Sequence, residues 1–597
     1  MFPTSVKEMK ELGWEQADVV LFTGDAFIDH PAFGSAVVAR VLEHAGYKIA
    51  VIPQPNWRDD LRDFKKMGMP RLFFGVTSGN MDSMVNHYTA NKRLRSNDAF
   101  TPGGKAGQRP DYAVTVYSKI LKSLYPQVPI IIGGIEASLR RLTHYDYWSD
   151  SLKPSILIDS QADLLVYGMA EKAIVEIANK LNGGEQIQNL ARIPQTACCS
   201  NNLPSMGKER MAVLTSFEEC VKSKNAFARN FVLTEEESIK IEQRFLAEKT
   251  GGTYVIVNPP FPVLSQDEID SIYDLPFTRR PHPRYDGKEK IPAYEMIKDS
   301  VTIHRGCFGG CSFCTISAHQ GKFISSRSKK SVLKELDSIV QSPFFKGHIT
   351  DLGGPSANMY EIKGMNVKQC AVCKRPSCLY PVLCKNLDIN YAPLIDLYNE
   401  ARKVKGIKKI TVGSGIRYDL IIDKNNKPVD LLALKYFEEL VVHHVSGRLK
   451  VAPEHTSEKV LKHVRKPSFN HFLDLYKRFT DICDRYGLQQ QLIPYFISSL
   501  PACELEDMAE LSLHLKKLNM KLEQVQDFTP TPMTLASVMF YTGFDPYTLE
   551  KINISRSIQE KKIQQLFFFS HNKEKRKELK AELLKMKRFD IINILHL

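Results

Sequence analysis

Short apolar runs alternate with amphipathic stretches along the first third of the chain. The apolar runs, rich in Val, Ile and Leu, lie within residues 17–22, 47–53, 71–76, 128–134 and 162–168. The stretches with apolar positions at helical spacing are residues 34–46, 111–126 and 171–181. Apolar runs without polar alternation are typical of strands covered on both faces, and strands that alternate with helices favour a mostly parallel sheet. We therefore predict a Rossmann-like, doubly wound α/β domain over residues 1–195.

Several loops of this predicted domain directly follow strands and are candidates for binding a ligand. In doubly wound sheets, ligands bind outside the carboxyl ends of the strands. The loops in question are residues 23–34, 77–98 and 133–141. The second is long for a connection and rich in side-chain donors, among them Asn80, His87 and Arg93. Its length and composition favour a functional loop over a disordered one.

Residues 196–290 show no regular alternation of this kind. They combine a helix-like stretch at 234–250, a strand-like stretch at 253–260 and a proline-rich, aromatic stretch at 273–296. Clustered prolines and glycines are typical of loops and extended segments. We predict a connector that wraps over the domain that follows it.

A second alternating series begins at residue 300. Its predicted strands are residues 300–304, 348–352, 409–413, 448–452, 491–497 and 523–528. Its predicted helices include residues 331–341, 393–404, 430–440, 468–484 and 504–518. Six such units are too few for a closed eight-stranded barrel but suit a partial (β/α)6 TIM-type barrel, with its active site at the carboxyl ends of the strands. Residues 291–545 are assigned to this barrel.

Composition and charge predict where the protein is located in the cell, and they indicate a basic C-terminal tail. No run reaches the roughly 18 apolar residues that span a bilayer, and the first residues lack the layout of a signal peptide. We therefore predict a cytoplasmic protein with no membrane partner. Residues 551–597 carry 12 Lys or Arg against 5 Asp or Glu, within a formal net charge of +14. In the predicted basic helical tail, residues 546–597, the spacing of Leu579, Leu583 and Ile594 fits a docked amphipathic helix, and its basic face could also approach RNA.

The stretch "CFGGCSFC" places Cys307, Cys311 and Cys314 within eight residues. Seven of the twelve cysteines lie between residues 307 and 384, and in a reducing compartment such clustering favours metal binding over disulfides. A structural zinc site takes four protein ligands, whereas three thiolates on an iron-sulfur cubane leave one iron open. Glycines between the first two cysteines let the backbone curl closely around a large cluster. The spacing favours a cluster over zinc with a remote fourth ligand, or over incidental thiols.

A second group of cysteines lies in the long loop after the second predicted barrel strand, on the same face as the first. Its members are Cys370, Cys373, Cys378 and Cys384. Four thiols fit an auxiliary iron-sulfur cluster or a closed zinc site, and unligated thiols are the third alternative. The other cysteines fit ordinary thiols of the fold: Cys198, Cys199, Cys220, Cys483 and Cys503.

The stretch "RGCFGGCSFC" resembles the CxxxCxxC signature of the radical S-adenosylmethionine (SAM) superfamily, in which an aromatic residue, here Phe313, usually precedes the last cysteine. The resemblance implies that Cys307, Cys311 and Cys314 hold a 4Fe-4S cluster whose open iron chelates SAM. It also implies an enzyme that reductively cleaves SAM to a 5′-deoxyadenosyl radical. The implied partner is a reductant such as flavodoxin or ferredoxin. The substrate does not follow from the resemblance.

Weaker motifs of the same superfamily imply the residues that contact SAM. "DLGGPS" resembles the glycine-rich motif after the second barrel strand, which would place Gly353 and Gly354 beside the methionine moiety. "GSGIR" and "APEHTSEKVLKHVRK" resemble segments that contact the ribose and the carboxylate, with Ser414, Arg417 and Glu454 as the candidates.

Across nearly the whole chain, the sequence resembles the YgiQ family of radical SAM proteins. The stretches that carry this resemblance are residues 25–34, 77–90, 133–141, 303–314 and 527–534. The N-terminal domain also resembles cobalamin-binding domains in layout. Their D-x-H-x-x-G signature is absent, because Asp29 and His30 are adjacent and Gly34 lies four residues beyond the histidine. Cobalamin is therefore not expected.

Two alternative hypotheses assign the protein to a functional class other than enzymes. An iron-sulfur redox sensor or electron carrier would use the cluster without SAM chemistry, although it has no need of a barrel cavity. A zinc-dependent nucleic-acid-binding protein would account for the net charge and the cysteines, and predicts zinc without iron. Within the enzyme hypothesis, the substrate is a metabolite or RNA. The RNA version draws on the basic tail and on the similarity of residues 527–537 to the end of the barrel in RNA methylthiotransferases.

Overall fold

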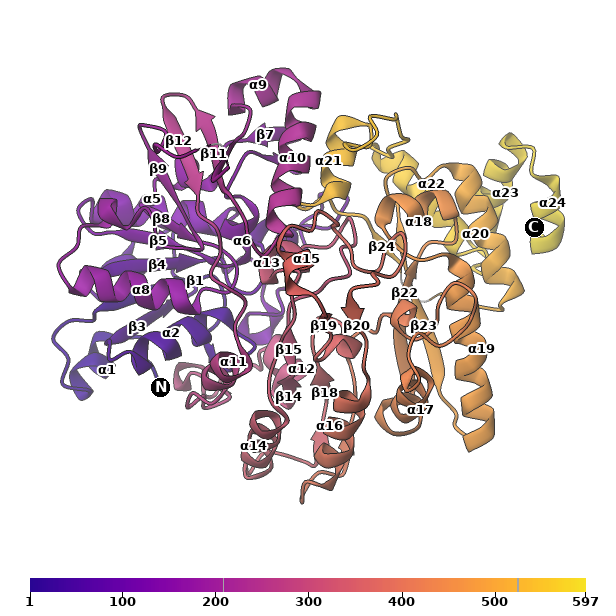
Figure 1. Ribbon diagram of the computed structural model, residues 1–597, viewed down its shortest axis with the longest axis horizontal. Coiled ribbons are helices and arrows are strands. Elements are labelled where there is room, and N and C mark those ends of the chain that lie inside the picture. The colour runs from indigo at the N-terminus through magenta and orange to yellow at the C-terminus, as the bar shows by residue number, and fades with distance from the viewer. Residues whose placement is uncertain (208, 523–524) are drawn as a thin grey trace.

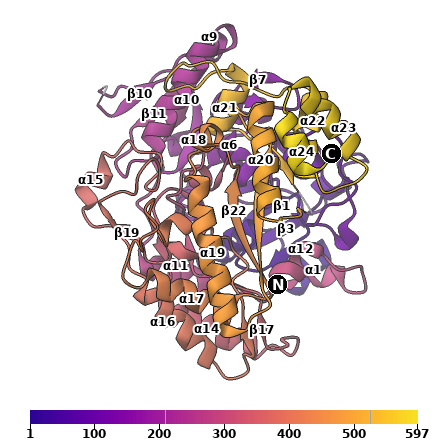
Figure 2. The same cartoon turned by 90° about the vertical axis from the view of Figure 1, so that its right-hand side faces the viewer.

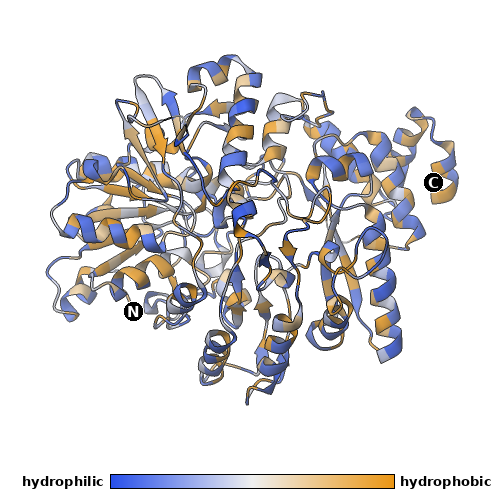
Figure 3. Cartoon of the chain, in the orientation of Figure 1, coloured by the Kyte–Doolittle hydropathy of each residue, from blue (hydrophilic) through white to orange (hydrophobic). Residues whose placement is uncertain are grey.

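The computed structural model describes residues 1–207, 209–522 and 525–597. Two α/β regions lie side by side, and helices of the C-terminal tail pack at the far end of the second region (Figure 1). Strands are mostly hydrophobic, whereas the outward faces of the helices are hydrophilic (Figure 3). No helix of the described residues is long and apolar enough to cross a membrane.

The first region is built on one large sheet. In the described residues its strand order is β10-β11-β12-β9-β8-β5-β4-β1-β3. Five neighbouring strands of this sheet run parallel: β1 (Val19–Thr23), β3 (Ile49–Pro53), β4 (Phe73–Thr77), β5 (Ile130–Ile132) and β8 (Leu164–Val166). Each lies within or overlaps one of the apolar runs predicted as strands. The prediction of a largely parallel sheet is confirmed.

Helices cover both faces of this sheet. Val19 and Leu21 of β1 pack in one core with α2 (Gly34–His44) and α8 (Glu171–Asn182). Val20 and Phe22 point the other way, into a core shared with α5 (Ala113–Leu124). Because successive residues of a strand face opposite sides of its sheet, full burial of β1 requires this double covering. The remaining helices and strands up to residue 160 are α1 (Val6–Glu11), β2 (Ile28–Asp29), α3 (Arg62–Lys65), α4 (Ser83–His87), α6 (Gly134–Leu139), β6 (His144–Asp146), β7 (Ser151–Lys153) and α7 (Ile156–Ser160).

The sheet continues past residue 195, where the connector was predicted to begin. It gains β9 (Thr196–Ser200), β10 (Met211–Val213), β11 (Phe245–Thr250) and β12 (Thr253–Val257), with α9 (Phe217–Lys222) and α10 (Lys224–Ser238) between them. The predicted connector is therefore wrong over 196–257, and the helix predicted at 234–250 is a strand in its second half. β11 and β12 are joined by a tight turn and pair antiparallel. Pairing within the sheet, rather than local pattern, fixes these short strands.

The rest of the predicted connector packs against the first region through a short strand. After α11 (Gln266–Tyr273), the short β13 (Arg280–Pro281) pairs antiparallel with β2. The same stretch touches the second region, since Arg279 forms an ion pair with Glu335 of α14 (Lys329–Val340). It thus bridges both regions, and α12 (Pro292–Ile297) leads into the second.

The second region places parallel strands where the sequence predicted them. The strands are β14 (Ser300–Thr302), β17 (His348–Ile349), β18 (Asp351–Gly353), β21 (Lys409–Ile410), β22 (Arg448–Glu454), β23 (Gln491–Ser498) and β24 (Gln526–Asp527). β14 pairs with β18, β17 with β21, and β22, β23 and β24 pair in order. Within the described residues no ladder joins β21 to β22. The last predicted strand, 523–528, lies partly outside the described residues.

Helices follow these strands, as the alternating pattern predicts. They are α14, α16 (Ala392–Lys403), α17 (Ala433–His444), α19 (Phe469–Tyr486) and α20 (Leu505–Lys517). α19 and α20 line the end of this region that faces away from the first (Figure 2). The shorter elements are β15 (His304–Arg305), α13 (Ile316–Gln320), β16 (Ser325–Ser326), β19 (Lys363–Gly364), α15 (Val367–Ala371), β20 (Leu387–Asp388), α18 (Glu458–Val464) and α21 (Leu535–Thr542).

The predicted tail is helical and docks on the second region. It forms α22 (Ile558–Phe568), α23 (Arg576–Lys585) and α24 (Phe589–Leu595). Leu579 and Leu583 are fully buried in the same core as the second region, so the docking predicted from their spacing is confirmed. Ile594, from the same predicted stripe, is 43% exposed.

Candidate functional site

The loop of the first three cysteines follows the first strand of the second region, at its carboxyl end. β15 and β16 pair antiparallel and hold the loop at its base. The backbone N–H of Cys307 donates to the Gly321 carbonyl (3.1 Å), and that of Ser312 donates to Val464 (3.2 Å). The loop is therefore anchored at both ends to the face where the active site of a barrel is expected.

The three cysteines are half-buried and influence one another. Burial raises the pKa of Cys307 to about 11, and the neighbouring Cys311 adds to the rise. Burial likewise raises the pKa of Cys314 to about 12, with contributions from Cys311 and Cys307. The sulfurs are thus close enough to repel one another as anions. Cys307 and Cys314 are therefore protonated at neutral pH when unligated, and metal binding has to displace those protons.

Arg417, predicted as a SAM contact, lies against this loop. Its Nη1 donates to Cys311 Sγ (3.0 Å), and its other nitrogens bind Asp419 at 2.5 and 2.9 Å. Burial acts to lower the pKa of Arg417, but the Asp419 carboxylate holds it well above its usual value. A Cβ at Gly309 would come within 3.1 Å of Arg417 Nη1. Glycine at this position therefore leaves room for the guanidinium beside the sulfurs.

Glu454, at the end of β22, also lies beside the cysteine loop. It has a left-handed backbone (φ +67°) and forms an ion pair with Lys466 (3.4 Å). Burial raises the pKa of its carboxyl group above the usual value. Its charge adds to the raised pKa of Cys314. The positive charge of the neighbouring Lys466 acts to lower the pKa of Cys307.

The other candidate SAM contacts line a cavity. Ser414 Oγ donates to Asp351 Oδ2 (2.5 Å), and the Gly413 N–H donates to Oδ1 of the same carboxylate (2.9 Å). A Cβ at Gly353 would collide with the Ser414 hydroxyl, and one at Gly354 with the His304 ring. The structure therefore brings Gly353, Gly354 and Ser414 together in the cavity wall. Arg417 and Glu454 do not line this cavity and lie against the cysteine loop instead.

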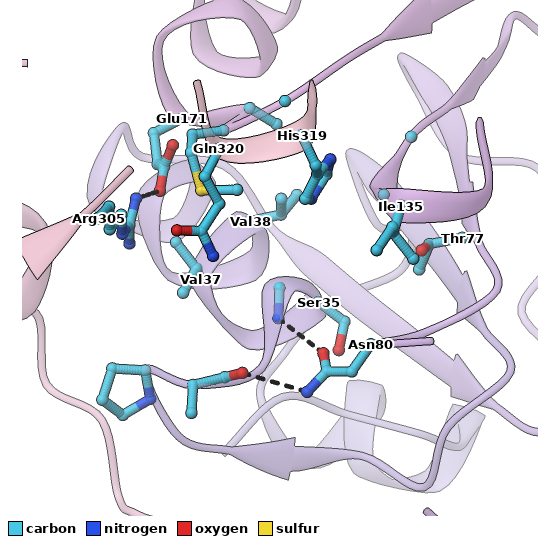
Figure 4. Close-up of a pocket in the computed structure, with 18 of the residues that line it drawn as sticks. Ser35, Val37, Val38, Thr77, Asn80, Ile135, Glu171, Arg305, His319 and Gln320 are labelled. Carbon is cyan, nitrogen blue, oxygen red and sulfur yellow. Dashed lines mark hydrogen bonds and ion pairs between the residues drawn. The ribbon is translucent and has the colours of Figure 1, made fainter. Parts of the chain in front are cut away.

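This cavity, of about 560 Å³, lies between the two regions (Figure 4). Its walls include residues from each loop predicted to bind a ligand: Pro31, Ala32 and Gly34, then Thr77, Gly79 and Asn80, then Gly133, Gly134 and Ile135. The rule that ligands bind outside the carboxyl ends of strands thus located the cavity from sequence. In the long second loop only its first residues line the cavity, whereas His87 and Arg93 do not.

The cavity also contains polar groups that were not among the predicted site residues. His304 is fully buried, and both of its ring nitrogens lack a partner. His319 Nδ1 also lacks one. Glu171 of the first region forms an ion pair with Arg305 of the second. His304 stands three residues before Cys307, which is a usable signal, but nothing in the sequence shows that Glu171 meets Arg305.

The second cysteine group lies directly against the first loop. The Cys378 N–H donates to the Phe308 carbonyl (3.0 Å), and Ser377 Oγ donates to the Gly309 carbonyl (2.7 Å). A Cβ at Gly310 would collide with the carbonyl oxygen of Pro376. These contacts confirm that both groups occupy the same face. Burial raises the pKa of Cys378, and Cys384 and Cys373 add to the rise.

No three His, Cys, Asp or Glu side chains of the described residues are grouped so as to hold a metal ion as they stand. This applies equally to both cysteine groups. Both nonetheless present sulfurs that accept hydrogen bonds: Cys307 from Gly309 N–H (3.4 Å), Cys373 from Arg375 N–H (3.5 Å) and Cys370 from Asn386 Nδ2 (3.2 Å). Such donors accompany thiolate ligands in iron-sulfur sites.

Comparison with known proteins identifies the family. Residues 1–300 match the family described as Radical SAM N-terminal, and residues 523–595 match a domain of unknown function (DUF3362). A UPF0313 protein of Bacteroides thetaiotaomicron is 54% identical, covering 100% of this chain and 98% of the relative. One from Methanocella arvoryzae is 43% identical, covering 98% and 95%. The chain belongs to the UPF0313 family. As a member of the radical SAM family, the protein is an enzyme. The family membership expected from the cysteine motif is thereby confirmed.

Solved structures offer only distant likenesses. The radical SAM methyltransferase TsrM from Kitasatospora setae, with tryptophan and a SAM analogue bound, is 15% identical with a TM-score of 0.47, covering 87% of this chain and 75% of that chain. OxsB, a cobalamin-dependent SAM radical enzyme with aqua-cobalamin bound, is 13% identical with a TM-score of 0.46, covering 88% and 55%. At these TM-scores neither carries an argument about the UPF0313 chain. The prediction that cobalamin is absent finds no support in them.

Proposed function

We propose that the protein reductively cleaves SAM to methionine and a 5′-deoxyadenosyl radical, and uses that radical on a substrate held by a six-stranded partial barrel and the Rossmann-like region. The observation that carries the proposal is the loop of Cys307, Cys311 and Cys314 at the carboxyl end of β14, next to a cavity of about 560 Å³. Iron-sulfur cubanes normally take four cysteine thiolates, so three from this loop would leave one iron open to SAM.

Cys307, Cys311 and Cys314 would hold a 4Fe-4S cluster. The soft thiolate set suits iron and sulfide. Arg417 donates to Cys311 Sγ, and Lys466 adds positive charge near Cys307. Hydrogen bonds to sulfur and nearby cations favour the reduced, more negative state of a cluster. When bound and reduced, the cluster supplies the electron that breaks the S–C5′ bond of SAM, with a reductant such as flavodoxin or ferredoxin as its source.

The predicted SAM contacts would act from two sides. Gly353, Gly354 and Ser414 would approach SAM from the cavity, and Arg417 and Glu454 from the cysteine loop. Asp351 fixes the Ser414 hydroxyl, so that side chain is positioned before SAM arrives. The apolar walls of the cavity would exclude water, which is what a reactive radical requires.

We also propose that Cys370, Cys373, Cys378 and Cys384 bind a second metal centre, either an auxiliary iron-sulfur cluster or zinc. Two observations support this second centre. Residues 376–378 contact the first cysteine loop, and neighbouring thiols of the group raise the pKa of Cys370 and Cys378. Four thiolates from one loop complete either type of centre.

Anaerobic reconstitution tests the enzymatic proposal. The protein is incubated with iron, sulfide, dithionite and SAM, and 5′-deoxyadenosine is quantified by mass spectrometry. We expect product and an iron-sulfur absorption band in the wild type. Cys314→Ala should abolish the product and the part of the band that comes from the first cluster, whereas Cys199→Ala, on the exposed side of β9, should keep the product and the full band. A protein that takes up only zinc and forms no 5′-deoxyadenosine would contradict the proposal.

A further inference from the structure

The cavity between the two regions has glycine-rich walls. Gly75, Gly79, Gly133, Gly134 and Gly168 line it from the first region, and Gly353 and Gly354 from the second. A Cβ at any of these positions would meet other protein atoms, for example Leu21 at Gly75, so the glycines let the walls pack closely. The other walls are mainly aliphatic, as Val37, Val38 and Ile135 show in Figure 4.

Hydrogen-bonding groups in this cavity are left without partners. Both ring nitrogens of His304, Nδ1 of His319 and Oε2 of Glu171 make no hydrogen bond and are buried. His304 is 0% exposed. Figure 4 shows His319 pointing into the same space as Val38 and Ile135. Buried polar groups are normally satisfied, so a ligand or ordered water has to complete these.

The chemistry of these groups limits the ligand. Burial lowers the pKa of His304 to about 3 and that of His319 to about 4, so both imidazoles are neutral at physiological pH. A neutral imidazole offers one donor and one acceptor, whereas the Glu171 carboxylate only accepts. A matching ligand therefore carries both N–H donors and acceptors.

The charged side chains of the cavity wall already have partners. The Glu171 carboxylate is paired with Arg305, and Asp351 accepts hydrogen bonds from the Ser414 hydroxyl and the Gly413 N–H. Burying an uncompensated charge costs much more than burying a hydrogen-bonded neutral group. Away from Gly353, Gly354 and Ser414, where SAM is proposed to bind, the described walls thus suit an uncharged ligand.

We propose that this cavity binds an uncharged heterocycle with N–H donors and carbonyl or ring-nitrogen acceptors, held between the two regions by His304, His319 and Glu171. Such a ligand would lie next to Gly353, Gly354 and Ser414, where it could be the substrate of the radical reaction. Only this last role rests on the proposed function.

Lumichrome, an uncharged fused heterocycle, serves as the probe, and its fluorescence is titrated with the protein. We expect saturable quenching by the wild type. His304→Phe and His319→Phe keep the ring shape but remove the polar atoms, and each should weaken binding about tenfold, or ~1.4 kcal/mol. His571→Phe, on an exposed residue of the tail, is the matched control and should bind as the wild type does. Ile135→Trp, which fills the cavity, should abolish quenching.

Two further probes test charge and polarity. Phenanthrene has a similar ring size without hydrogen-bonding groups, and its binding should not respond to His304→Phe. Flavin mononucleotide adds a phosphate to a related ring and should bind at least tenfold more weakly than lumichrome. The proposal is overturned by absence of lumichrome binding to the wild type, by equal binding to His304→Phe, or by purified protein that retains a corrinoid.

A variant without the first cysteine group separates this inference from the proposed function. In Cys307→Ala/Cys311→Ala/Cys314→Ala we expect unchanged lumichrome binding and no 5′-deoxyadenosine. Wild type that forms 5′-deoxyadenosine but does not bind lumichrome would overturn the heterocycle site alone. Wild type that binds lumichrome but forms no 5′-deoxyadenosine would contradict the enzymatic proposal alone.

Discussion

Arg417 connects the cysteine loop to a buried carboxylate. Its guanidinium donates to Cys311 Sγ on one side and to both oxygens of Asp419 on the other. Burial acts to raise the pKa of Asp419, but the charge of Arg417 and its hydrogen bonds hold it below the usual value. The pair is therefore ionised, and each member depends on the other.

Removing Arg417 alone should destabilise the protein strongly. We expect Arg417→Met to lower the free energy of unfolding by about 3–5 kcal/mol, because it leaves Asp419 buried and uncompensated. The double variant Arg417→Met/Asp419→Met should recover most of that loss. Urea denaturation of the unligated proteins measures both, with Arg58→Met, on an exposed side chain, as the control. Equal destabilisation of the single and double variants would show that the pair is not coupled.

At the level of single residues, the sequence predicts the candidate cluster ligands, the three cysteines, better than it predicts the residues that surround them. Cys307, Cys311 and Cys314 are fixed by spacing within one loop, and the structure places them where the strand pattern implied. Contacts between distant segments have no local signature. The bond of Arg417 to Cys311 and the ion pair of Glu171 with Arg305 join residues that are 106 and 134 positions apart.

The loop that carries the second cysteine group has little regular structure of its own. Between β18 and α16 the described residues form only short elements, among them α15, β19 and β20. A small cluster of buried apolar residues, including Phe308, Ile362 and Leu379, lies between this loop and the first cysteine loop. A segment with so small a core gains much from a metal centre.

Loss of one cysteine from this loop should leave the first cluster in place. We expect Cys378→Ala to lose the metal of the second centre and to lower the melting temperature of the reconstituted protein. The iron-sulfur absorption due to Cys307, Cys311 and Cys314 should persist. Metal analysis and anaerobic absorption spectra check this, with Cys199→Ala as the matched control. Identical metal content in Cys378→Ala and the wild type would argue for unligated thiols in this loop.

At the level of elements, alternation of apolar runs with helices was a reliable guide where strands are parallel and buried. It located the five parallel strands β1, β3, β4, β5 and β8 and the helices that follow the later strands. It failed at β9 to β12, which are added at one side of the sheet. Local patterns do not show that an antiparallel addition pairs with β8 rather than forming a linker.

At the level of the whole molecule, the tail also contacts the first region directly. Lys561 of α22 is 2% exposed, and its Nζ donates to Tyr147 OH (2.6 Å) and to the Ala90 carbonyl (3.2 Å). Two charged groups of neighbouring segments also affect the pKa of Lys561: Asp527 acts to raise it, and Lys92 acts to lower it. A basic tail thus contributes a buried amine to the interface, in addition to its surface charge.

This amine should make stability depend on pH. Burial lowers the pKa of Lys561 from 10.5 to about 8, whereas the unfolded chain keeps the ordinary value. Between these values the unfolded state binds more protons, so the free energy of unfolding should rise as pH increases from 8 to 10.5. The gain should be on the order of 2–3 kcal/mol. Burial raises the pKa of Tyr147 to about 12, so its hydroxyl stays protonated throughout.

Urea unfolding under reducing, anaerobic conditions at pH 7.5, 9.0 and 10.5 measures this dependence. Other groups titrate in the same window, so the informative quantity is the difference between variants. Lys561→Met should lose the rise, whereas Lys562→Met, on the exposed neighbouring residue, should keep it. If all three proteins show the same slope, the amine is not buried in solution and the tail does not close against the first region. In that case Lys561 does not constrain the cavity between the two regions, and lumichrome binding should be the same in Lys561→Met and the wild type.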